Sequence, residues 1–155
     1  MRDIHNRQTG RGFLVMLITW VLAVILGWLI FYKGLGGFYD VNTVHYEGFL
    51  RQHVLLVPLF LSYLAQAAFL VFVLHWLEEV STFGRGFVVG AVLFLLVNAG
   101  LDFYLYSMFN MINGAVVLVD ILVQGIYGGI LGGVAGWLLG LGPKPKDPRT
   151  IKNAE

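Results

Sequence analysis

Two aspartates, Asp102 and Asp120, each interrupt a long apolar stretch of the chain. A carboxylate in the hydrocarbon of a membrane is costly unless it is paired, hydrated or protonated, so an acid there is a functional-site hypothesis by default. Two carboxylates close together cannot both ionise cheaply. One should hold or share a proton, or a cation should bind beside them. The residue types therefore predict a site for a proton, a cation or a small polar solute.

An amide lies one helical turn from each acid, since Asn98 is four residues before Asp102 and Gln124 is four residues after Asp120. Residues four apart share one face of a helix. Counting from the predicted turn between the two helices puts both acids at similar depth, roughly 9–12 Å, with the amides one turn deeper. The four side chains predict one site. The alternative is a hydrogen-bonded structural lock between the helices.

Arg51 and His53 are expected near the level of the two acids, at the outer end of the second apolar segment. They could guard the mouth of a pathway, or they could be ordinary interfacial anchors. At the other end of that segment, His75, Glu78 and Glu79 leave a lipid-modifying enzyme as a third class. No nucleophile or second ligand cluster accompanies them, so we expect no catalytic residue, no metal site and no cofactor.

The composition is that of a membrane protein. Of 155 residues, 58% are hydrophobic and 12% are charged, against about 25% charged in soluble domains. The chain has no cysteine, which excludes disulfides and thiolate metal sites. Its net charge is +1, and no basic stretch is long enough to suggest a nucleic-acid partner.

The fold class predicted is all-α, with four antiparallel transmembrane helices in a single polytopic domain, residues 1–155. Each of four apolar segments has the roughly 20 residues that a helix needs to cross about 30 Å of hydrocarbon. The predicted spans are Gly12–Tyr32, Val54–Leu77, Phe87–Met108 and Ala115–Leu139.

The positive charges predict the orientation. Eight lie on the side of the two termini: Arg2, Arg7, Arg11, Arg85, Lys144, Lys146, Arg149 and Lys152. Only Lys33 and Arg51 fall on the other side. The positive-inside rule then puts both termini in the cytoplasm, in agreement with an even number of helices.

Glycines recur along the fourth segment at a spacing that favours close helix packing. One row comprises Gly128, Gly132, Gly136 and Gly140, and a second stripe comprises Gly125, Gly129 and Gly133. The row could form a subunit interface, or it could pack against another helix of the same chain.

The chain resembles a bacterial family of small four-helix integral membrane proteins of unknown function. The likeness is carried by Gly86 and Gly90, by the run 101–104 (Leu-Asp-Phe-Tyr) and by the run 119–122 (Val-Asp-Ile-Leu). At Gln124 and Gly125 the chain departs from the family, which usually has a tryptophan and a glycine closer to the acid. The resemblance implies an integral protein of the bacterial inner membrane and no established activity.

We expect a transporter- or channel-like protein with Asp102 and Asp120 as its binding or translocation site. A bundle this small rarely encloses a whole pathway, so a homo-oligomer in the lipid bilayer is expected. The alternative is a non-catalytic accessory or assembly subunit of a larger membrane complex, in which the glycine row would dock and the acids would hold the helices together.

Overall fold

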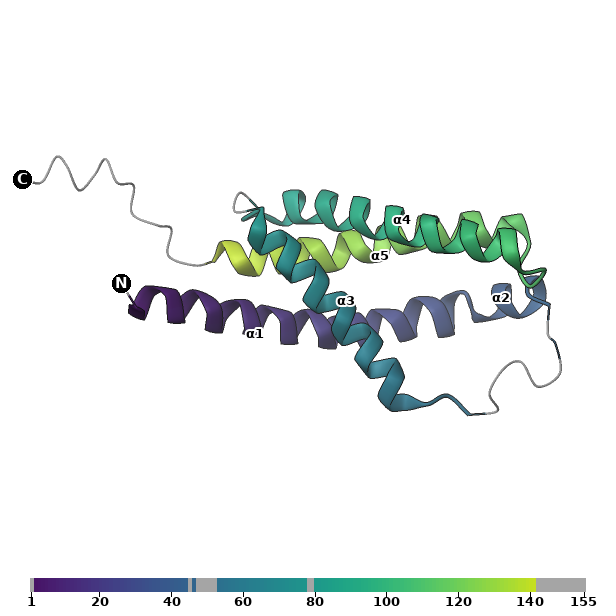
Figure 1. The fold of residues 1–155 in the computed structure, drawn as a ribbon, viewed down its shortest axis with the longest axis horizontal. Coiled ribbons are helices and arrows are strands. Elements are labelled where there is room, and N and C mark those ends of the chain that lie inside the picture. The colour runs from purple at the N-terminus through teal and green to yellow at the C-terminus, as the bar shows by residue number, and fades with distance from the viewer. Residues whose placement is uncertain (1, 45, 47–52, 78–79, 142–155) are drawn as a thin grey trace, which may run out of the picture.

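The computed structural model describes residues 2–44, 46, 53–77 and 80–141, with side chains from residue 10 onward. Regular structure in these ranges is helical, apart from one bridge between Thr43 and Ile112. In chain order (Figure 1), the helices are α1 (Arg2–Gly27), the π-helical η1 (Trp28–Gly34), α2 (Gly36–Asn42), α3 (Leu56–Trp76), α4 (Phe83–Met108) and α5 (Gly114–Gly140).

Four helical stretches are long and apolar enough to cross a membrane, which confirms the predicted number of spanning segments. They are Gly10–Gly34, Leu56–Trp76, Phe83–Met108 and Gly114–Gly140. Large apolar side chains on their outer faces stay exposed, among them Phe72 at 69% and Trp76 at 78%. Such extensive apolar exposure is unusual for a soluble protein and suits contact with lipid.

The helix boundaries differ from those predicted by one or two residues in α3 and α5 and by more in α1 and α4. The first helix begins at Arg2, and η1 prolongs it to Gly34. The third spanning helix, α4, begins at Phe83, four residues before the predicted Phe87. Thr82 explains this earlier start, because its side chain accepts a hydrogen bond from the backbone nitrogen of Arg85 (3.4 Å) and so caps the helix.

The connection between the first two predicted spans, residues 33–53, contains a short helix that was not predicted. This helix, α2, has glycines at its first two positions, Gly36 and Gly37. Glycine has a low helix propensity, so these residues by themselves do not favour a helix. The tertiary contacts of α2 described below outweigh that preference.

Helices α4 and α5 pack along each other, and α3 crosses α1 obliquely (Figure 1). Side chains from one helix donate to main-chain carbonyls of another: Tyr127 to Ala23 (3.0 Å), Trp20 to Phe60 (3.0 Å) and Arg11 to Leu138. Tyr127 lies at the centre of the bundle, 1% exposed, and makes edge contacts with the rings of Phe31 and Phe94.

Candidate functional site

The seam between α4 and α5 begins with main-chain contact at paired glycines. A Cβ atom added to Gly132 would overlap the carbonyl oxygen of Gly86 and lie 2.9 Å from the Cα of Gly90. A Cβ added to Gly90 would overlap the carbonyl oxygen of Gly128. Residue numbers rise along one helix as they fall along the other, so α4 and α5 run in opposite directions. Only glycine allows this close approach.

The glycine row of α5 is therefore occupied within the chain. Gly136 meets Gly86, and Gly140 meets the main chain of Ser81. The second stripe also faces α4, where its members lie against Phe83, Phe87 and Leu95. Of the two interpretations of this row, packing inside one chain is what the structure shows. The row is therefore not a free surface for another subunit.

The same seam carries the predicted polar residues. In steps of four, the α4 side comprises Gly86, Gly90, Phe94, Asn98 and Asp102, and the α5 side comprises Gly136, Gly132, Gly128, Gln124 and Asp120. Gly86 contacts both Gly132 and Gly136. When this pairing is continued along both helices in steps of four residues, Asp102 of α4 comes level with Asp120 of α5. The glycine row and the acids thus belong to one continuous helix contact.

The two acids approach each other across this seam. Asp102 is only 9% exposed, and its Oδ2 has no hydrogen-bond partner among the described residues. Its carboxyl group interacts directly with that of the half-buried Asp120. Asp102 lies six residues before the end of α4, and Asp120 lies six residues after the start of α5. Both are therefore about 9 Å from the helix ends, at equal depth.

Tyr39 of α2 is the third member of the site, and the sequence analysis missed it. Its hydroxyl donates a hydrogen bond to Oδ1 of Asp120. Burial raises the pKa of the Tyr39 hydroxyl, and the hydrogen bond and negative charge of Asp120 raise it further, followed by the charge of Asp102. Tyr39 therefore stays protonated and remains a donor at ordinary pH. Its position in a glycine-rich loop gave no signal of this contact.

Three contacts hold α2 and the residues after it on the turn between α4 and α5. Asn113 Nδ2 donates to Asn42 Oδ1 (3.0 Å). The backbone nitrogen of Val44 donates to the carbonyl of Met111 (2.8 Å). The hydroxyl of Tyr46 donates to the carbonyl of Asn110 (3.2 Å). Together they fix the position from which Tyr39 reaches Asp120.

Asn113 links this docking to the start of α5, because its Oδ1 accepts from the backbone nitrogen of Val116 (3.0 Å). We expect Asn113→Ala to lower the free energy of unfolding in detergent by about 1 kcal/mol, as the loss of a helix N-cap does. Asn110→Ala is the matched control, because Tyr46 contacts only the main chain of Asn110. Equal stability of the two variants would contradict the capping role.

The remaining predicted site residues do not join the cluster directly. Asn98 is half-buried, but its Nδ2 donates to the carbonyl of Phe94 in its own helix (2.8 Å). Gln124 is half-buried on α5, in register with Asn98. His53 is exposed just before α3, and Arg51 lies outside the described residues.

The group of His75, Glu78 and Glu79, considered above for an enzyme, is only partly described. His75 is exposed in the last turn of α3, whereas Glu78 and Glu79 lie outside the described residues. Across the part of the chain that is described, no group of three or more His, Cys, Asp or Glu side chains could hold a metal ion.

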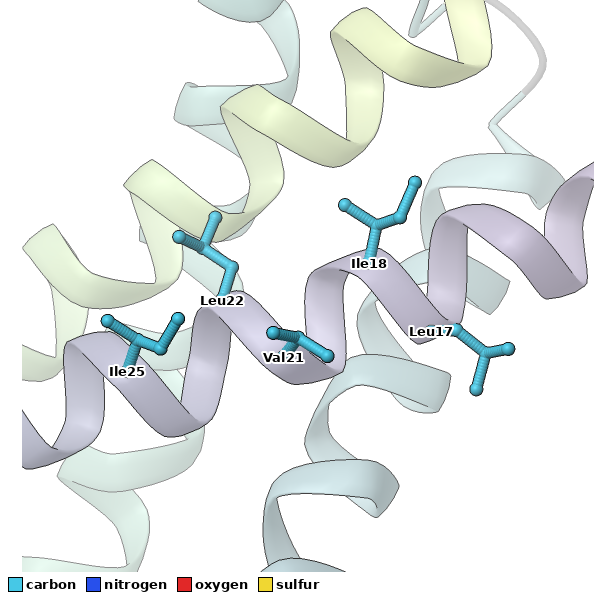
Figure 2. A pocket seen from close by; sticks show the side chains of 5 residues that line it. All are labelled: Leu17, Ile18, Val21, Leu22 and Ile25. Atoms are coloured by element: carbon cyan, nitrogen blue, oxygen red, sulfur yellow. The ribbon is translucent and has the colours of Figure 1, made fainter.

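A shallow apolar depression of about 400 Å³ lies on the surface of α1 (Figure 2). Its lining consists of Leu17, Ile18, Val21, Leu22 and Ile25, all from this one helix. Figure 2 shows Leu17 pointing away from Ile18, Leu22 and Ile25, so these side chains do not surround an enclosed chamber. It offers no polar side chain to orient a ligand, and lipid chains would suit it.

No family model matches the chain, and no curated protein or solved structure matches it either. The likeness to the bacterial four-helix family stays a prediction. The function of the chain must therefore be inferred from the acidic pair and its surroundings.

Proposed function

We propose that the chain is a small transporter- or channel-like membrane protein in which Asp102 and Asp120 bind a proton, a cation or a small polar solute. The observation that carries this proposal is the buried Oδ2 of Asp102, which has no hydrogen-bond partner among the described residues and lies beside a second carboxyl group. An arrangement built only to hold helices together would be expected to satisfy this oxygen. An unsatisfied carboxylate oxygen beside a second acid, within two spanning helices, favours ligand binding.

The proposed topology is four antiparallel helices in the bacterial inner membrane, with both termini in the cytoplasm. The eight positive charges on the side of the termini and the two on the other side support it. The opposite directions of α4 and α5 agree with it. In this orientation the acidic pair and Tyr39 belong to the outer half of the membrane.

The proposed path continues inward from the acids to Asn98 and Gln124 and then meets apolar packing. Beyond these amides the seam comprises Phe94 and paired glycines, which bring no polar side chain. A full passage would therefore need a second copy of the chain or a movement of α4 against α5. This requirement supports the proposal of a homo-oligomer.

The same closed seam favours a second candidate, an accessory subunit in which the acids serve as a structural lock. Native mass measurement in mild detergent separates the two functions. A homo-oligomer or a lone chain is expected for the transporter, whereas a stable complex with other proteins would favour the accessory subunit.

The direct test is a flux assay in proteoliposomes for protons, sodium and potassium. We expect Asp102→Asn and Asp120→Asn to reduce flux to the level of empty liposomes, because each keeps the shape of the side chain but removes its charge. Asp40→Asn is the matched control, since Asp40 is an exposed acid on α2. Flux that is unchanged in both seam variants would refute the proposed function.

A further inference from the structure

The surroundings of Asp102 restrict what the acidic pair can bind. Its carboxyl group is buried to about nine-tenths, with 9% exposed, and faces Asp120. Oδ2 has no donor among the described residues. Full negative charge on such an oxygen is costly in a low-dielectric environment, and a bound positive ion or a proton would relieve it.

The groups that act on this pair come from three helices. Asp102 belongs to α4, Asp120 to α5 and Tyr39 to α2, and each acts on the others through charge or a hydrogen bond. The nearest ammonium group along the chain from Tyr39, that of Lys33 on η1, lies over the rings of Trp28 and Tyr32, at 5.4 and 5.6 Å from their centres.

Four other tyrosines of the packed helices have surroundings of their own. The hydroxyl of Tyr127 on α5 donates to the carbonyl of Ala23, and the Tyr63 ring of α3 fits against Gly27. Tyr104 and Tyr106 of α4 are exposed. Among the described residues, the groups shown to act on one another at this site are two acids and one neutral donor.

This donor set is poor for a divalent cation. Calcium takes about 6–8 oxygen ligands, and magnesium demands near-octahedral geometry. The site brings together three oxygen-bearing side chains, and Tyr39 directs its proton at Asp120. Two carboxyl groups in contact can instead share a single proton, which lowers their joint charge from −2 to −1.

We propose that the ligand of this site is one proton, taken up from the outer side and held on the Asp102 carboxyl where it faces Asp120. This inference depends on the proposed function for its role in transport but not for its chemistry. Tyr39 stabilises the charged partner, Asp120, by donating to Oδ1. The bound proton completes the site with one protonated acid, one carboxylate and one phenol donor.

Infrared difference spectroscopy of the full chain in nanodiscs, titrated with acid and base in sodium-free buffer, tests this directly. We expect the wild type at neutral pH to show the carbonyl band of a protonated carboxylic acid, and Asp40→Asn to keep it. Combined Asp102→Asn and Asp120→Asn substitution should remove the band. Tyr39→Phe should retain it to higher pH, because the carboxylate loses its donor.

Two outcomes would overturn the proton assignment: no such band at neutral pH, or loss of the band when sodium or potassium is added at constant pH. Should the double variant fail to fold, the shift in Tyr39→Phe still assigns the band to this site, and an unshifted band there would count against it. Comparison with the flux assay separates the two proposals. A band without flux supports the proton site and removes the transport role, whereas aspartate-dependent flux without a band does the reverse.

Discussion

Replacing Gly132 by leucine is expected to separate α4 from α5 and to lower the free energy of unfolding by more than about 3 kcal/mol, since added bulk in a well-packed contact typically costs about 1–3 kcal/mol even where neighbours can adjust. Here the neighbours are main-chain atoms: an added Cβ already overlaps the carbonyl oxygen of Gly86 and lies 2.9 Å from the Cα of Gly90. A helix backbone cannot move aside as a flexible side chain can.

Substitutions of increasing size at Gly132 test this contact further. Gly132→Ala adds only the Cβ and should cost about 1–3 kcal/mol, although alanine by itself favours a helix over glycine by about 1 kcal/mol. Gly100 is the matched control on α4, because it is exposed and a Cβ there would meet nothing within 4 Å. Gly100→Ala and Gly100→Leu should be as stable as the wild type or slightly more stable.

Thermal unfolding in detergent, with size-exclusion chromatography to confirm a folded, monodisperse species, measures the series. If leucine at positions 100 and 132 lowered stability equally, the glycine contact between α4 and α5 would be contradicted. Because Asp102 and Asp120 belong to the same seam, we also expect Gly132→Leu to eliminate the infrared band proposed for the acidic pair.

The four spanning helices could be predicted from the sequence because spanning depends on the length and apolarity of one continuous segment. The helix ends were harder, since the start of α4 depends on Thr82 acting as a cap. The π-helical continuation of α1 to Gly34 depends on backbone geometry that no residue pattern predicts.

One side of the contact between α4 and α5 could also be predicted. The glycine spacing indicated a close contact but left its partner open. The spacing of four that joins Gly86 and Gly90 to Asp102 was visible in the sequence, and with it the acids and the glycines could have been assigned to one contact.

Tyr39 could not be predicted, because its role depends on tertiary docking. Its loop is held to the α4–α5 turn by Asn42 and Asn113 and by the main chain of Val44. The sequence suggested Arg51 and His53 for the same outer region, on grounds of charge. An uncharged donor from α2, a helix outside the predicted spans, contacts Asp120. The acid pair therefore has a phenol beside it that the sequence did not predict.

Removing the side chain of Tyr127 is the second change expected to have a large effect. Tyr127→Ala should lower the free energy of unfolding by about 3–5 kcal/mol, as truncation of a buried aromatic ring does. The ring is 1% exposed and contacts Phe31 and Phe94, at 5.7 and 5.8 Å between ring centres. A cavity there would loosen α5 from both η1 and α4.

Tyr127→Phe separates the ring from its hydroxyl. It keeps the aromatic contacts and loses only the hydrogen bond to the carbonyl of Ala23 (3.0 Å), so it should cost about 1 kcal/mol. Tyr104→Ala is the control, since Tyr104 is 57% exposed on α4 and its loss should change stability little. A cost for Tyr127→Phe as large as that for Tyr127→Ala would mean that the hydrogen bond to α1, and not the packing of the ring, holds α5 in place. Equal and small costs for Tyr127→Ala and Tyr104→Ala would instead show that the bundle does not depend on this aromatic core.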